Sequence, residues 1–157
     1  MSDDNSARAI AAAEQLGLAH TVTRHGPVRS LEEAAEARGV EPRAIVKTLV
    51  VRVADGDYRF VLVPGDREIA WPKLRALLDV NRLSMPSAEV ALEVTGYVRG
   101  TITPLGSSTA WPVIVDSAIS GLVSVGGGAH GVALTVDAGE LADRLDATVA
   151  DVTDPRD

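Results

Sequence analysis

Two stretches rich in β-branched residues, joined by a tight-turn signal, constrain the fold of this chain most strongly. Residues 44–53 and 58–63 are mostly apolar, and Asp55-Gly56-Asp57 separates them. Branched side chains favour strands, and a short turn containing Asp-Gly between two such runs is typical of a hairpin. The sequence therefore predicts an antiparallel β-hairpin over residues 44–63.

Lys47 is the unusual residue of the first strand. Alternation of side chains along a strand places it on the same face as Leu49, Val51 and Val53, which we interpret as a core face. A charged amine there is costly unless its head reaches water or an anionic partner, so Lys47 indicates a charge at the mouth of a pocket. The alternative is a lysine near the start of the strand whose stem lies along apolar neighbours and whose head is solvated.

Residues 95–106 form a second unusual segment, because three glycines and a proline surround short apolar stretches. Glycine lets the backbone approach a ligand closely, and proline fixes the turn that follows. The run Gly100-Thr101-Ile102-Thr103-Pro104 can therefore present main-chain amides to an oxyanion or an ester carbonyl without a side-chain nucleophile. The alternative is an ordinary strand connection with turn residues.

The other expected elements are helices and strands along the whole chain. Helices are expected at residues 5–15, 30–38, 72–78, 87–94 and 138–145, the second of them opened by the capping pattern Ser30-Leu31-Glu32-Glu33 and ended by Gly39. Strands are expected at residues 20–24, 101–102, 113–115, 122–125, 132–136 and 147–152, and residues 154–157 are expected to form a loose tail.

Composition predicts a single domain over residues 1–157, since 157 residues with 46% hydrophobic content can bury a substantial core. The chain has no cysteine, the N-terminus has no basic and apolar leader, and no stretch is long enough to span a membrane. We therefore expect a soluble cytoplasmic protein without a membrane partner.

The distribution of charge bears on a nucleic-acid partner. The net charge of −7 argues against broad electrostatic capture of nucleic acid, DNA included. Residues 43–99 hold nine basic and seven acidic side chains, so this segment carries +2 and the remainder −9. A modest basic face for an RNA end fits this distribution, and solvated exterior side chains would explain it equally well.

Several other chemistries lack support. His20, His25 and His130 do not have the spacing of metal ligands, and we expect neither a metal nor a cofactor. Gly126-x-Gly128-x-x-Gly131 has the form of a dinucleotide fingerprint, but the residues after it alternate as a strand where that fingerprint needs a helix. The sequence also has no Gly-x-Ser-x-Gly elbow for a serine hydrolase.

Taken together, these segments resemble the YbaK/prolyl-tRNA synthetase-associated editing domain family. The features that carry the resemblance are the pair Lys47-Thr48, the loop from Gly100 to Pro104 preceded by Thr95-Gly96-Tyr97, Asp116 after an apolar strand, and the glycine-rich residues 124–131. Their order follows that of the family from about residue 25 to about residue 148.

The resemblance implies an α/β (α+β) fold with a mixed, strongly curved, barrel-like sheet surrounded by helices. It implies hydrolysis of the ester that joins a wrong amino acid, such as cysteine, alanine or another small one, to the 3′ end of a tRNA, in particular the tRNA for proline. The implied partners are the tRNA acceptor end and a synthetase. The implied catalytic set is Lys47 with residues 100–104, and the implied substrate-binding residues are Thr48, Gly96, Tyr97, Asp116, Gly127, Gly128 and His130.

Two departures from the family pattern bear on substrate choice. Residues 100–104 read Gly-Thr-Ile-Thr-Pro where many members have Gly-Gly-x-Ser-Pro, and Ala129-His130 stands where many have two basic residues. The backbone role of the loop survives the first change, whereas the second weakens an expected contact to RNA phosphates. The alternative from another class is a non-catalytic module that binds an aminoacyl-tRNA end, a nucleotide or a partner protein.

Overall fold

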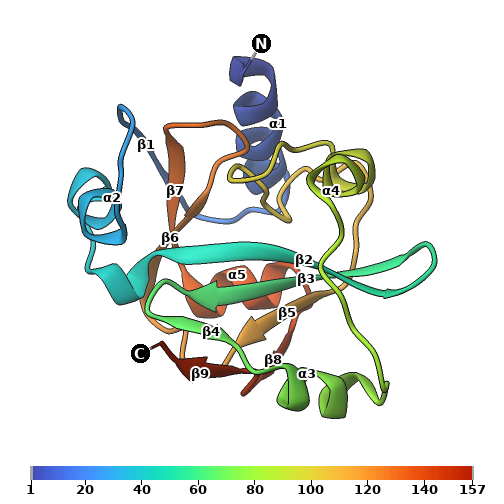
Figure 1. Cartoon of the computed structure of the whole chain (residues 1–157). Coiled ribbons are helices and arrows are strands. Elements are labelled where there is room, and N and C mark those ends of the chain that lie inside the picture. The colour runs from blue at the N-terminus through green and yellow to red at the C-terminus, as the bar shows by residue number, and fades with distance from the viewer. Residues whose placement is uncertain (1, 157) are drawn as a thin grey trace.

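The computed structural model describes residues 2–156 (Figure 1). In chain order its elements are α1 (Ser2–Gln15), β1 (Thr21–Arg24), α2 (Leu31–Arg38), a 3₁₀ turn (Pro42–Ala44), β2 (Val46–Ala54), β3 (Asp57–Pro64), β4 (Arg67–Ile69), α3 (Trp71–Leu78), α4 (Ala88–Thr95), β5 (Val113–Asp116), β6 (Leu122–Gly126), β7 (Val132–Asp137), α5 (Ala138–Arg144), β8 (Thr148–Ala150) and β9 (Thr153–Pro155). The predicted helices and the predicted hairpin are confirmed, with small shifts of their boundaries.

The hairpin of β2 and β3 belongs to a four-stranded sheet with the order β2-β3-β5-β8. β2 and β3 are antiparallel, whereas β5 is parallel to both β3 and β8, so the sheet is mixed as predicted. A three-stranded sheet has the order β1-β7-β6, and β4 pairs with β9 in a two-stranded ribbon.

The expectation of a strongly curved, barrel-like sheet is wrong. Over the described residues the strands form three separate sheets, and none of them closes on itself. Closure fails at the outer edge of β2, where isolated bridges from Ile45 to Ser124 and from Arg52 to Ser84 replace a continuous ladder. A barrel needs an unbroken hydrogen-bonded ladder around its circumference. Between the two bridges the edge of β2 has no such ladder, so it stays open.

Both faces of the four-stranded sheet are covered. Val46 and Val50 of β2 pack into the main core with side chains of α1, and Val51 packs on the opposite face with Leu74 of α3. In Figure 1, α1 and α4 lie on one side of this sheet and α3 on the other. The face that Lys47 shares with Val51 is therefore a core face at Val51, as predicted, but the other face of the strand is buried too.

The helix ends follow their sequence signals. The amide of Glu33 donates to Ser30 Oγ over 3.1 Å at the start of α2, and Gly39 ends that helix with φ 71°. The amide of Val90 donates to Ser87 Oγ over 3.2 Å at the start of α4. These caps fix the ends of α2 and α4.

No helix within residues 2–156 is long and apolar enough to cross a bilayer.

Three local predictions are corrected. Residues 101–102 lie in a loop and not in a strand, and the last predicted strand is limited to β8. The expected loose tail instead contains β9, whose Thr153 pairs with Ile69 of β4. Strands of three residues have too little alternation to be recognised in a sequence. Asp157, the end of the expected tail, lies outside the described residues.

Candidate functional site

A cavity of about 310 Å³ follows the open edge of β2. Six consecutive residues, 45–50, line one wall, and the start of α4 and the loop residues Gly100 and Ile102 line the other. Because successive side chains of a strand point to opposite faces, a cavity that meets six residues in a row must run along the edge of the strand.

Main-chain groups of β2 point into this cavity. Arg52 donates its amide to the carbonyl of Ser84 over 2.8 Å, and its carbonyl accepts the amide of Ser84 over 3.2 Å, both at the outer edge of the strand. In an antiparallel strand the main-chain groups of every second residue face the same edge. The amides and carbonyls of Thr48 and Val50 therefore face the cavity.

A second cavity of about 510 Å³ adjoins the first. It is lined by residues 25–28 and 129–132, and three residues, Arg38, Gly100 and Gly126, line both cavities. We call the two cavities together the β2 groove. Each volume falls in the range of roughly 300–1,000 Å³ that is usual for ligand pockets.

The charge of the β2 groove is opposite to that of the chain. Its described lining residues include Arg38, Lys47 and Arg99 but no Asp or Glu, although the net charge of the chain is −7. A larger cavity of about 740 Å³ elsewhere has a mixed lining, in which Arg43 forms an ion pair with Glu41. The β2 groove is therefore the better candidate site for an anionic ligand.

The loop after α4 has two free amides in residues that line the β2 groove. Thr101 donates both its amide (2.9 Å) and its hydroxyl (2.6 Å) to the carbonyl of Val98, which closes the turn. Within the described residues, the amides of Gly100 and Ile102 have no hydrogen-bond acceptor, and both residues line the first cavity. Two main-chain donors with no protein partner suit a ligand oxyanion.

Buried polar atoms without partners gather at the same place. Among the described residues, four buried side-chain atoms lack a hydrogen-bond partner, and three of them, His25 Nε2, Arg38 Nε and Thr48 Oγ1, belong to residues that line the β2 groove. Unpaired buried polar groups are rare and each is costly, which makes such a cluster a mark of a functional site.

Lys47 is half-buried and lines the first cavity. It pairs with Val63 and so leaves β2 on the α3 side of the sheet, whereas Thr48 leaves it on the side of the main core. Burial lowers the pKa of the Lys47 amine, the charge of Arg156 lowers it further, and Glu68 opposes both. The amine is thus a partly desolvated charge at the open edge of the sheet.

Five of the predicted substrate-binding residues do not line the β2 groove, and four of them lie in the loop and the glycine turn. Tyr97 is fully buried and donates its hydroxyl to the carbonyl of Leu105 over 2.6 Å, and Gly96 ends α4 with φ 80°. Gly127 and Gly128 are needed for close packing, since a Cβ at Gly128 would lie 2.8 Å from the Tyr97 ring. These four residues hold the loop and the glycine turn in position without lining the β2 groove themselves.

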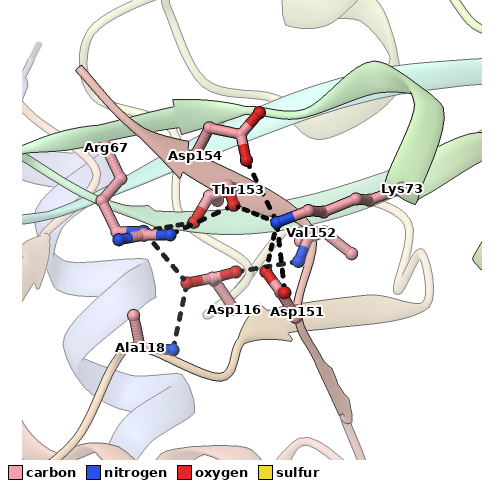
Figure 2. Close-up of polar contacts among 8 residues, drawn as sticks. All are labelled: Arg67, Lys73, Asp116, Ala118, Asp151, Val152, Thr153 and Asp154. Carbon is pink, nitrogen blue, oxygen red and sulfur yellow. Dashed lines mark hydrogen bonds and ion pairs between the residues drawn. The ribbon is translucent and has the colours of Figure 1, made fainter. Parts of the chain in front are cut away.

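Asp116 does not line the β2 groove and belongs to the cluster that ties the C-terminal strands to β5 (Figure 2). Its carboxylate is 1% exposed and accepts the amides of Ala118 and Val152, each over 3.0 Å. The Nε of Arg67 lies 4.0 Å from the same carboxylate. The structure therefore gives Asp116 a position that holds the end of β5 to the start of β9.

His130 is exposed and lines the second cavity beside Gly100, where a Cβ on Gly100 would be 3.6 Å from His130 Cε1. Thr103 is fully buried, and its hydroxyl accepts the amide of Leu105 over 3.2 Å. The structure thus brings Lys47, Thr48, Gly100, Ile102 and His130 to the β2 groove.

Arg38 is the groove residue that sequence reasoning missed. A usable signal exists, because Arg38 follows Ala34 by four residues and Ala35 by three, and these two alanines are the buried residues of α2. Helix periodicity places all three on one face.

Among the described residues, no group of three His, Asp or Glu side chains is arranged to hold a metal ion.

The family model of the aminoacyl-tRNA editing domain matches residues 25–143. The chain belongs to the aminoacyl-tRNA editing domain family. Its mixed arrangement of helices and sheets is that of a solved structure described as a candidate trans-editing enzyme for prolyl tRNA synthetase. The TM-score is 0.86 at 28% identity, and the match covers 96% of this chain and 97% of that one.

Proline–tRNA ligases contain segments similar to this editing domain. The chain is 42% identical over 96 residues (60% of its length) to the enzyme of Thermosipho melanesiensis, and 30% identical over 120 residues (76%) to that of Bacillus licheniformis. These matches cover 17% and 21% of the ligases. The chain thus spans about a fifth of the length of these curated relatives.

Proposed function

We propose that this chain hydrolyses, in trans, the ester that joins a wrongly attached amino acid to the 3′ end of a tRNA. The proposed substrate is the tRNA for proline carrying cysteine, alanine or another small amino acid, and the proposed partners are the tRNA acceptor end and a synthetase. Membership of the editing family and likeness to segments of proline–tRNA ligases support this proposal. The observation that carries it is the β2 groove, whose described lining has three basic residues, no acid and a loop with free amides.

In the proposed chemistry, the free amides of Gly100 and Ile102 hold the ester carbonyl and stabilise the negative charge that develops on its oxygen. A water molecule attacks the carbonyl carbon; where a group of the substrate attacks first, water then cleaves the acyl bond so formed and completes the hydrolysis. The bond to the ribose oxygen then breaks, and that oxygen takes the proton that the attacking group loses. Lys47 holds the terminal ribose or its phosphate.

The first cavity would select the amino acid by size. It is bounded by apolar side chains that include Ile45, Leu49 and Ile102, and its volume of about 310 Å³ is at the small end of the usual range. A synthetase pocket rejects small or isosteric side chains weakly, so a second small pocket that admits only such side chains supplies the missing discrimination.

The predicted site residues take two kinds of role in this proposal. Thr48 and His130 contact the substrate, because both line the β2 groove. Gly96, Tyr97, Thr101, Thr103, Pro104, Gly127 and Gly128 hold the loop and the glycine turn in position, and Asp116 holds β5 to the start of β9.

The test is a deacylation screen with the purified chain and tRNA for proline charged with cysteine, alanine or proline, beside tRNAs charged with serine and threonine. We expect hydrolysis well above the spontaneous rate for at least one small amino acid and little for proline. Lys47→Ala should abolish this activity and leave the melting temperature nearly unchanged.

Lys73→Ala is the matched control, because Lys73 is the only other lysine in the chain and lies outside the β2 groove. It should keep the wild-type rate. Binding of aminoacyl-tRNA without hydrolysis of any substrate would contradict the proposal and favour the non-catalytic binding module.

A further inference from the structure

Arg38 occupies the junction of the β2 groove. It lies in the last turn of α2, and it lines both the cavity along β2 and the cavity beside His130. Among the described lining residues of the second cavity, it is the one with a permanent charge. Any ligand that fills both cavities therefore passes this guanidinium.

The guanidinium of Arg38 has few partners within the protein that could offset the cost of burying its charge. Nη1 donates to Ser124 Oγ at 3.5 Å, the upper limit for such a contact, and Nε is buried without a partner. No carboxylate of the described residues forms an ion pair with it. Burial lowers the pKa of Arg38, and no charged neighbour opposes this.

A half-buried guanidinium without a partner destabilises the protein unless an anion pairs with its charge and accepts its hydrogen bonds. A lysine could lose its proton instead, but arginine stays charged at any ordinary pH. Its five donors match the oxygens of a phosphate group in a two-point contact. Leucine or methionine would pack against Ala34 and Ala35 with no such cost, so the arginine indicates a ligand.

We propose that Arg38 binds a phosphate ester at the junction of the two cavities. Resting on the proposed function, this phosphate is the one that precedes the terminal nucleotide of the tRNA, with the aminoacyl ester in the first cavity and the nucleoside in the second. Arg38 is then a specificity residue for the nucleotide end of the tRNA, and Lys47 contacts the terminal ribose.

The test compares the binding of adenosine, 5′-AMP, inorganic phosphate and the trinucleotide CCA by calorimetry, in wild type and in Arg38→Met. Wild type should bind 5′-AMP more tightly than adenosine. Arg38→Met should reduce that preference by about 10- to 100-fold, the usual effect of losing a hydrogen bond to a charged group. The slope of log affinity for CCA against log salt should fall by about 0.7.

Arg82→Met is the matched control, since Arg82 is exposed and lies outside the β2 groove. It should keep the preference for 5′-AMP. Arg38→Lys keeps a positive charge without the planar fork, so it should give an intermediate preference, and it serves as the test variant should Arg38→Met fold poorly.

Equal binding of adenosine and 5′-AMP by wild type, or an undiminished preference in the Arg38 variants, would overturn the proposal. Inorganic phosphate that binds as tightly as 5′-AMP, and only when Arg38 is present, would keep the phosphate site and assign its source to free phosphate. The binding assay needs no hydrolysis. A chain that shows the Arg38-dependent preference but deacylates nothing would refute the proposed function alone, whereas active Arg38→Met with unchanged KM would refute the role of Arg38 alone.

Discussion

Thr101 closes the loop at the β2 groove on Val98, because its amide and its hydroxyl both donate to the Val98 carbonyl, over 2.9 and 2.6 Å. This double contact occupies the one hydroxyl that stands between Gly100 and Ile102 in the chain. The amides of Gly100 and Ile102, on either side of it, have no protein acceptor in the described structure. The hydroxyl of Thr101 is thus engaged in a structural contact, which agrees with the proposed mechanism, in which main-chain amides hold the ester.

Thr101→Val should therefore affect stability more than catalysis. The change keeps the branched Cβ and the amide contact to Val98 but removes the hydroxyl contact, which should cost about 0.5–1.5 kcal/mol of unfolding free energy. Urea unfolding and steady-state deacylation measure the two effects. Loss of turnover in a variant that unfolds like wild type would assign a catalytic role to the hydroxyl.

Lys47→Met should stabilise the chain at neutral pH. Burial lowers the pKa of Lys47 in the folded state, so between that value and the unfolded value of about 10.4 the unfolded chain binds more protons. As the pH rises from the folded to the unfolded pKa, the unfolding free energy of the wild type increases. Below the folded pKa the amine is charged in both states, so the folded state bears the full cost of its desolvation. The advantage of Lys47→Met, read from melting temperatures, should thus shrink as pH rises towards about 10.4.

Lys73→Met is the control of opposite sign. Hydrogen bonds to Asp154 and Asp151 raise the pKa of Lys73, so its stabilising contribution is fully present below the unfolded pKa and is lost as pH rises through the higher folded value. This variant should be less stable than wild type at neutral pH. If both lysine variants shift the melting temperature in the same direction, the environment assigned to Lys47 is incorrect.

Asp116→Ala should destabilise the fold without a specific effect on substrate binding. The buried carboxylate accepts two amides, and its removal leaves both without an acceptor, which should cost roughly 2–4 kcal/mol. Asp151→Ala removes an exposed carboxylate nearby and should have a much smaller effect. A raised KM for aminoacyl-tRNA with unchanged unfolding would return Asp116 to the substrate-binding set.

Local patterns in the sequence were sufficient for the hairpin and the helices. The turn at Asp55-Gly56-Asp57 and the caps at Ser30 and Ser87 act within a few residues, so their signals are complete in the sequence. Pairing between distant segments has no such signal. The ribbon of β4 and β9 and the open outer edge of β2 depend on contacts between residues far apart in the chain.

The candidate site was predictable where a residue conflicts with its local environment. Lys47 on an apolar strand and Gly100 in the loop are conflicts of this kind, and the structure brings both to one groove. Asp116 follows a buried strand, a position that suits a turn cap as well as a ligand-binding residue, and its contacts to Ala118 and Val152 are structural ones. Arg38 was missed because a charge in the last turn of a helix is also favoured by the helix dipole.

The single-turnover deacylation rate of Gly100→Val, measured on the best substrate of the screen, tests most directly whether the loop backbone in the β2 groove hydrolyses the ester. Gly100 has φ 90°, which a β-branched residue does not adopt without strain, so the substitution displaces the amides at the cavity. We predict a loss of at least about 10²–10³ in rate, the usual effect of removing one oxyanion donor. Thr103→Ala, which alters a buried side chain of the same loop, should stay within a few-fold of wild type. An active Gly100→Val together with an inactive but folded Thr101→Val or Thr103→Ala would contradict the backbone mechanism.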